Sequence, residues 1–186
     1  MNAKELIEQI KNGDDKARGA AWQAADNAGA PAVRGLAELM FTGEQEVARA
    51  AKRALWRIVR YAGRPTGGDE AKAVAQQLVP MLASGDPNVR REFVWMLSEI
   101  GDSDAVPTIA LLLNNPNLRE DARAALQRIP GETSLRSLKV ALKNGAEDHK
   151  PAIAESLRAR GEQVKVFPTQ KLVPKKPTSV KTPTPA

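Results

Sequence analysis

The feature of this sequence that most constrains its fold is an internal repeat of about 30 residues. Five segments align with one another, beginning at residues 17, 47, 89, 118 and 149, and each has Ala or Leu eight residues after its start. The steps between the starts are 30, 42, 29 and 31 residues, so the second unit carries an insertion of about a dozen residues. Because a unit this short cannot bury its apolar face alone, the copies are expected to stack in a row.

Each unit has the pattern of two helices. In the segment 44–62, residues of one buried helix face recur with i, i+3, i+4, i+7 spacing: Val47, Ala50, Ala51, Ala54, Leu55, Ile58, Val59 and Ala62. The low aromatic content of 4% also favours helices over strands. The spacing predicts ten helices, over residues 2–12, 14–28, 31–41, 44–62, 70–84, 87–100, 103–113, 116–129, 132–143 and 147–160. The expected fold class is therefore all-α, an α-α superhelix of about five two-helix repeats.

Capping residues support these boundaries. Asn2 and Glu5 have the spacing of a capping box. Two pairs place a capping side chain before a proline in the first turn: Asp86-Pro87 and Asn115-Pro116. Three glycines stand where helices should stop: Gly13, Gly101 and Gly145. The insertion at 63–68 is rich in Gly and contains Pro, so it is expected to form an exposed turn.

The sequence lacks the side chains that most catalytic and metal sites need. The absence of Cys excludes a disulfide scaffold and a thiol nucleophile, and one histidine, His149, cannot form a histidine cluster. We expect His149 to be exposed at a charged helix start. No run of 18 apolar residues could cross a membrane, and the first residues lack an apolar signal core, so the expected location is the cytoplasm. We therefore expect no enzymatic activity, no cofactor and no metal.

The positive charge of the chain is concentrated at its C-terminal end. The formal net charge is +6, but residues 164–186 hold five Lys and no acid. Residues 1–163 hold 23 basic and 22 acidic residues, a net charge of +1. We therefore divide the chain into a repeat solenoid over 1–163 and a basic tail rich in Pro, Lys and Thr over 164–186. The tail shows no amphipathic period and is expected to be extended or disordered alone.

Residues 85–90, 97–102 and 105–107 read GDPNVR, LSEIGD and AVP, and in these segments the chain resembles HEAT-like repeats. The likeness is closest to the short bacterial type, of roughly 30 residues, in phycobilisome-lyase-like proteins, and it covers about residues 2–161. The resemblance implies a right-handed superhelix whose second helices line the concave side. It also implies a surface that binds another protein. It does not imply a bilin lyase, since nothing in the sequence singles out a chromophore pocket.

The helix expected at 44–62 carries a cationic stripe on its polar face. Arg49, Lys52, Arg53, Trp56, Arg57 and Arg60 follow helical spacing, and at 100° per residue Trp56 lies roughly opposite the apolar stripe. Two more tryptophans fall on second helices and could line the same face. The candidate partner-binding residues are therefore Arg49, Arg53, Trp56, Arg57, Arg60, Trp22 and Trp95.

Structural roles are the alternative for each of these residues. The stripe could be a solvated charged face, with Trp56 covered by arginine stems or by the insertion. Trp22 and Trp95 could pack on the next repeat, because large aromatic residues are usually mostly buried. Three arginines recur at equivalent positions and are expected to form a structural ladder with helix-start acids or loop carbonyls: Arg18, Arg90 and Arg119.

The tail is the second candidate for partner contact. It places apolar residues beside Lys and Pro, which suits docking as an extended or polyproline segment. The candidate docking residues are Phe167, Leu172, Val173, Lys175 and Lys176. A solubilising tail, or one that touches nucleic-acid phosphates non-specifically, is the alternative.

Two functions remain open from the sequence. The first is a non-enzymatic protein-binding scaffold or adaptor, free or within a larger complex, that binds an acidic or extended protein segment. The second is a nucleic-acid-binding protein. A weaker form of the second is an alkylpurine DNA glycosylase, because HEAT-like glycosylases use concave-face Trp, Asp and Arg residues, and Trp22 and Asp26 lie near Trp56, Arg57 and Arg60 in the next unit. The near-neutral body argues against this form.

Overall fold

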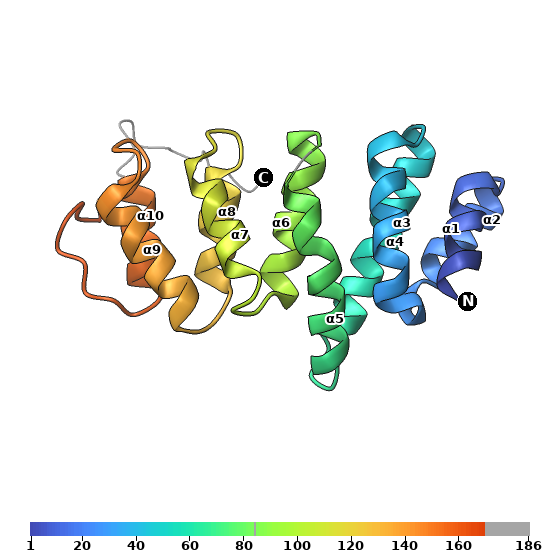
Figure 1. The fold of residues 1–186 in the computed structure, drawn as a ribbon, viewed down its shortest axis with the longest axis horizontal. Coiled ribbons are helices and arrows are strands. Elements are labelled where there is room, and N and C mark those ends of the chain that lie inside the picture. Colours follow the sequence, from blue (N-terminus) through green and yellow to red (C-terminus); the bar gives the residue numbers. More distant parts are fainter. Residues whose placement is uncertain (84, 170–186) are drawn as a thin grey trace, which may run out of the picture.

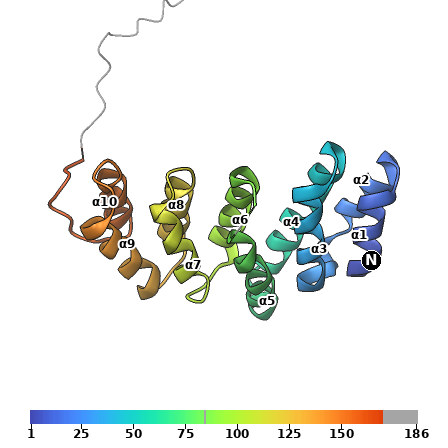
Figure 2. The ribbon, with the colours of Figure 1, turned by 45° about the horizontal axis from the view of Figure 1, so that its top comes forward.

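The chain folds into five helix pairs that stand side by side in a row, as a computed structural model shows (Figure 1). The structure describes residues 1–83 and 85–169. Within them are ten α-helices, three short 3₁₀ helices (η1, η2 and η3) and no strand. A second view, turned by 45°, shows the same row of helix pairs (Figure 2). The predicted all-α solenoid of two-helix units is confirmed.

Each pair contributes one helix to each of two layers. The first helices are α1 (Ala3–Asn12), α3 (Gly29–Thr42), α5 (Gly68–Leu78), α7 (Val106–Leu111) and α9 (Glu132–Asn144). The second helices are α2 (Asp15–Gln23), α4 (Gln45–Ala62), α6 (Pro87–Ile100), α8 (Arg119–Arg128) and α10 (Lys150–Ala159). Consecutive second helices contact one another, α2 with α4, α4 with α6, α6 with α8 and α8 with α10. We call the boundary between two consecutive second helices a seam.

One hydrophobic core runs through the whole row. It begins at Leu6 on α1 and ends at Leu157 on α10, and all eight apolar positions predicted on α4 belong to it. Most of these core residues are small or branched aliphatic, which lets the helices approach closely. Continuous burial between neighbours is what keeps units of this size folded, since none has a core of its own.

Several predicted helix ends are confirmed by their caps. Asn2 and Glu5 form a complete capping box on α1. The Asp86 side chain accepts hydrogen bonds from the Asn88 and Val89 backbone N–H groups at 2.7 and 3.3 Å. Three glycines follow the last helical residue as predicted: Gly13, Gly101 and Gly145. The insertion forms the turn between α4 and α5, and α5 extends beyond the edge of the row (Figure 1).

Two helices in the middle of the chain are shorter than predicted. Residues 70–84 were expected to be one helix, but α5 ends at Leu78 and continues as η2 (Val79–Leu82). Pro80 explains the change, because it has no N–H to donate within an α-helix. Residues 103–113 give α7 followed by η3 (Leu112–Asn114), and α7 begins late because Asp102 accepts from the Asp104 N–H and holds a turn.

Three second helices are also shorter than predicted, and one of them, α10, begins at Lys150 instead of residue 147. Asn115 does not cap α8; its side chain accepts from the Asn117 N–H at 2.9 Å, so a turn precedes the helix and delays its start to Arg119. The segment 14–28 divides into α2 and η1 (Asp26–Ala28). This division brings Asp26 against α4, where it binds Arg57.

The expectation that His149 is exposed is wrong. His149 is only 6% exposed, and its Nε2 atom lies 3.0 Å from Glu120 Oε2 on α8. His149 stands at the start of the fifth repeat segment, where Val47 and Leu118 are buried in earlier units. The same position is half-buried in the other two units, at Ala17 and Val89, so the charged sequence around His149 did not leave its side chain exposed.

Candidate binding surface on the second helices

One carboxylate, that of Glu92, joins α4 and α6 across their seam. Glu92 on α6 accepts a hydrogen bond from Lys52 Nζ at 2.5 Å and from Trp56 Nε1 at 3.1 Å, both on α4. Trp56 is half-buried and packs against the core. The indole that the sequence places opposite the apolar stripe therefore has a bonding partner within the chain, and Lys52 is neutralised.

The seam between α6 and α8 repeats this arrangement. Asp121 on α8 accepts from Arg91 Nε at 2.8 Å and from Trp95 Nε1 at 3.0 Å. Arg91 and Trp95 are four residues apart on α6, as Lys52 and Trp56 are on α4. Trp95 thus packs on the next repeat, which is the structural alternative given for it by the sequence.

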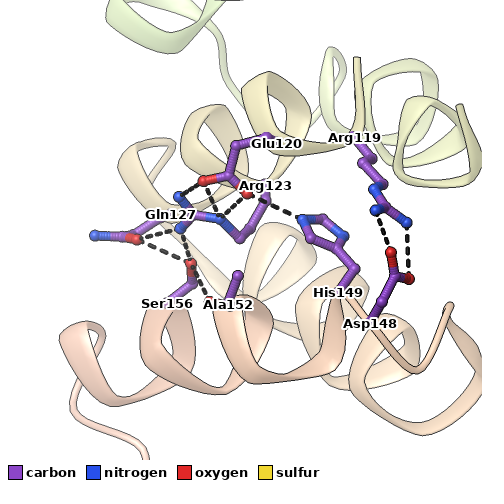
Figure 3. A network of polar contacts seen from close by, with 8 residues as sticks. All are labelled: Arg119, Glu120, Arg123, Gln127, Asp148, His149, Ala152 and Ser156. Carbon is purple, nitrogen blue, oxygen red and sulfur yellow. Dashed lines mark hydrogen bonds and ion pairs between the residues drawn. The ribbon is translucent and has the colours of Figure 1, made fainter. Parts of the chain in front are cut away.

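The seam between α8 and α10 is closed by a polar network without tryptophan (Figure 3). Glu120 accepts hydrogen bonds from Arg123, which also donates to Ser156 on α10. Arg119 forms a bidentate pair with Asp148, with N···O distances of 3.0 and 2.5 Å. The Arg123 guanidinium lowers the pKa of Glu120, and contact with His149 lowers it further. The hydrogen bond from Arg119 lowers the pKa of Asp148.

The seam between α2 and α4 differs, because arginines and a tryptophan meet there without a bridging acid. The Arg53 guanidinium lies over the Trp22 ring, 5.3 Å from its centroid. Further along α4, Arg60 lies over Trp56 at 5.1 Å. Both arginines are exposed, and both distances are within the range of cation–π attraction. We call these two contacts the arginine–tryptophan stacks.

The remaining cations of the predicted stripe are paired with carboxylates. Arg57 holds Asp26 with two hydrogen bonds of 2.6 and 2.9 Å, and this bonding raises the pKa of Arg57. Arg49 pairs with Glu46 at 2.9 Å. Within the part of the chain that the structure describes, Arg53 and Arg60 have no carboxylate within ion-pair distance. The stripe is therefore two separated free cations, Arg53 and Arg60, and not a continuous positive field.

The predicted arginine ladder forms at two of its three positions. Arg18 donates to the Ile10 and Gly13 carbonyls at 3.1 and 2.8 Å, and Arg119 binds Asp148 at the start of the next second helix. Arg90 does not join it, since its Nε atom is buried without a partner in the described part of the chain. The neighbouring Arg91 bridges to α8 instead.

Of the tail residues proposed for docking, the structure describes only Phe167. Arg158 donates to the carbonyls of Val164, Val166 and Phe167, so this stretch folds back along α10. Phe167 is half-buried and lines a hollow with Pro151 and Glu155. Four of the proposed docking residues lie outside the described residues: Leu172, Val173, Lys175 and Lys176.

Sequence reasoning missed Glu92 and Asp121, the two acids that close the central seams. A signal for them was present: each lies three residues after the start of its repeat segment, at Val89 and Leu118. The described residues contain no group of three or more His, Cys, Asp or Glu side chains placed to hold a metal ion. They also contain no helix long and apolar enough to cross a bilayer.

The fold and its seams define the class of this chain, an all-α solenoid of two-helix repeats. A family model described as HEAT repeats matches residues 75–158, and the units before residue 75 continue the same stacking. Over the matched range the chain is similar to HEAT repeat proteins. HEAT repeats commonly serve as protein-interaction scaffolds.

An engineered protein, whose crystal structure comes from the Northeast Structural Genomics Consortium, aligns with a TM-score of 0.48 and 19% sequence identity, over 84% of this chain and 78% of its own. No curated protein matches the chain in sequence.

Proposed function

We propose that this protein is a non-enzymatic binding scaffold that holds a protein partner on its second-helix face, between α2 and α6. The observation that carries the proposal is the pair of arginine–tryptophan stacks. Arg53 and Arg60 are exposed, ordered against indole rings and left without a carboxylate among the described residues, while neighbouring cations are all paired. Arg and Trp side chains dominate the binding energy of protein interfaces, so an ordered pair of stacks is a suitable anchor.

A protein partner suits this face better than a nucleic acid. Phosphate binding draws on several free cations in a row, but Asp26 and Glu92 interrupt the stripe on both sides of Arg53. The body of the chain has a net charge of only +1 over residues 1–163. Asp26, the acid in the glycosylase alternative, is held by two hydrogen bonds from Arg57, one from Nε and one from Nη2. These features favour recognition of acidic protein side chains.

The tail adds a second contact in this proposal. Its five lysines would attract an acidic partner. Phe167 lies beside α10, at the opposite end of the row from Trp22. The proposal places the scaffold in a bacterial cytoplasm, as the short HEAT type implies, either as a free adaptor or as a complex subunit.

The test is affinity capture from nuclease-treated bacterial extract with three forms of the full chain. We expect the native chain to retain a protein partner and the double variant Arg53→Gln with Arg60→Gln to lose it. Arg34→Gln is the matched control, because Arg34 is an exposed arginine on α3, in the other layer, with only a 3.5 Å contact to Glu38. Equal capture by all three forms would show that the arginine–tryptophan stacks are not needed for partner binding. A capture that disappears with nuclease would indicate nucleic acid instead.

A further inference from the structure

The central seams share a single three-group design. In each, a cation and a tryptophan four residues apart on one second helix bind one carboxylate from the next helix. Lys52 and Trp56 bind Glu92, and Arg91 and Trp95 bind Asp121. A charged acceptor between a cation and an indole N–H receives charge-assisted hydrogen bonds, which are stronger than neutral ones.

The first seam has the indole donor of this design but no acceptor for it. Arg18 and Trp22 on α2 have the same four-residue spacing, but Arg18 already donates to the Ile10 and Gly13 carbonyls and to Asp15. On α4, the position three residues after Val47 holds Ala50, whereas the matching positions after Val89 and Leu118 hold the two acids Glu92 and Asp121. Trp22 Nε1 donates no hydrogen bond to any residue in the described ranges, unlike the indoles of Trp56 and Trp95.

A small hollow lies where the acid is missing. Its volume is about 130 Å³, and Trp22, Arg49, Ala50 and Arg53 line it together with Arg18. A water molecule takes up about 30 Å³ of liquid, so the hollow has room for a carboxylate group and its neighbouring methylene. The hollow lies between the two helices and is open to solvent, so a side chain could enter it from outside.

The charges around the hollow leave one cation uncompensated. Two exposed acids, Asp15 and Glu46, also line the hollow; Asp15 pairs with Arg18 at 2.8 Å and Glu46 pairs with Arg49 at 2.9 Å. Arg53 has only the Trp22 ring as a partner among the described residues. An anion in the hollow would find a free guanidinium and a nearby indole N–H.

We propose that this hollow binds the carboxylate of an aspartate or glutamate side chain supplied by the partner protein. That carboxylate would take the role that Glu92 and Asp121 fill in the next two seams. The inference rests on the proposed scaffold function and names the chemistry of its partner. The partner completes a bonding pattern that the solenoid itself builds elsewhere.

Arg60 sets the position of a second acid in the partner. Arg53 and Arg60 are seven residues apart on α4, which corresponds to about 10.5 Å along the helix axis. Three residues of an extended polyproline II chain cover about 9 Å and bring side chains i and i+3 to the same side. The preferred ligand is therefore an extended segment that runs along α4 and carries two acidic residues three positions apart.

The test uses a capped, flexible peptide with two glutamates three positions apart, titrated into the ¹⁵N-labelled full chain. The readout is the ¹H–¹⁵N signal of each indole, with the Trp22 signal assigned through Trp22→Phe. We expect a saturable shift of the Trp22 signal. Affinity should fall about a hundredfold when both glutamates are replaced by glutamine, because each lost hydrogen bond between charged groups lowers it about tenfold. A peptide of the same composition with adjacent glutamates should also bind more weakly.

Variants of the chain make the test specific to the hollow. Arg53→Gln should weaken peptide binding about tenfold, and Arg34→Gln should leave it unchanged. Ala50→Glu should fill the hollow from within, shift the Trp22 signal without peptide and abolish peptide binding, whereas Ala50→Gln should still bind. Ala50 is only 5% exposed, so circular dichroism must first show that these two variants fold. If the two Ala50 variants do not fold, peptide binding by Arg53→Gln alone tests the hollow.

Three results would overturn the inference: no saturable shift of the Trp22 signal, equal affinity for the glutamine peptide, or unchanged binding by Arg53→Gln. A shift with oligothymidine but not with the peptide would also overturn it and assign the hollow to phosphates. The scaffold proposal is judged separately, because partner capture could still depend on Arg53 and Arg60 when the peptide fails.

Discussion

Trp56 Nε1 donates a hydrogen bond of 3.1 Å to Glu92 Oε2 across the seam between α4 and α6. The same carboxylate holds Lys52 through its other oxygen at 2.5 Å. A residue that the helical wheel places on the outer face is thus part of the contact between two repeats. Because stability in a repeat array is the sum of units and their interfaces, seam residues of this kind determine whether neighbouring units stay together.

Removing Glu92 should weaken the α4–α6 interface. Glu92→Ala leaves Lys52 and the Trp56 indole without their acceptor, and we expect a loss of about 1–2 kcal/mol in the free energy of unfolding. Urea denaturation followed by tryptophan fluorescence measures it. Glu99→Ala is the control, since Glu99 is exposed on the same helix and should change stability by less than about 0.5 kcal/mol. Equal effects of the two substitutions would show that Glu92 contributes no more to the free energy of unfolding than an exposed glutamate does.

Gly85 should not tolerate a side chain. Its φ is +100°, and an added Cβ would lie 2.3 Å from the ring of Phe41. We expect Gly85→Ala to lower the free energy of unfolding by about 1–3 kcal/mol. Gly68→Ala is the matched change, since a Cβ at Gly68 meets nothing within 4 Å. If Gly85→Ala unfolds at the same urea concentration as Gly68→Ala, the turn before α6 is not constrained in this way.

The interface between α8 and α10 should weaken in acid. Because Arg123 lowers the pKa of Glu120 and Arg119 lowers that of Asp148, the folded state binds fewer protons than the unfolded chain. The stabilisation is complete above the ordinary carboxyl pKa values near 4 and is lost as the pH falls through the lowered values. Amide hydrogen exchange in α10 measures it.

A double variant tests the cause of this pH dependence. Glu120→Gln with Asp148→Asn should flatten the pH dependence of α10 protection between about pH 5 and pH 2, because the two titrating groups are gone. An equally steep dependence in the double variant would assign the acid sensitivity to other carboxylates.

Arg57 should contribute less to partner binding than Arg53, although both lie on the predicted stripe. Asp26 already satisfies Arg57, whereas Arg53 has no acid within the described chain. We expect Arg57→Gln to change partner affinity less than about twofold and Arg53→Gln to lower it about tenfold, measured by calorimetry with the captured partner. A larger effect of Arg57→Gln would mean that the partner displaces Asp26.

The sequence predicted the architecture well, because apolar periodicity and caps are local signals. The buried face of α4 and the capping box at Asn2 were both readable without a partner helix. The helix ends at Leu78 and Arg119 were not, because Pro80 and Asn115 act through local geometry that competes with helix continuation. The burial of His149 depends on contact with Glu120, 29 residues earlier in the sequence.

The candidate site was predicted only in part, for the same reason. The sequence located Arg53, Arg60 and the three tryptophans on second helices. It could not show that Arg57 is paired with Asp26 or that Trp56 is bonded to Glu92, since each pair joins residues more than 30 positions apart. Contacts with neighbouring helices determine which cations of the stripe are paired and which are free. The spacing of residues along one helix cannot show this pairing.

The hydrogen-exchange rates of the three indole N–H groups in the free protein, measured by NMR, show whether the first seam lacks an internal acceptor. We expect slow exchange for Trp56 and Trp95, whose N–H groups are bonded to Glu92 and Asp121, and fast exchange for Trp22, whose acceptor we propose to be an acid of the partner. Exchange at Trp22 as slow as at the other two would show that its indole already has an acceptor within the chain, and the hollow would then have no need of a partner's carboxylate.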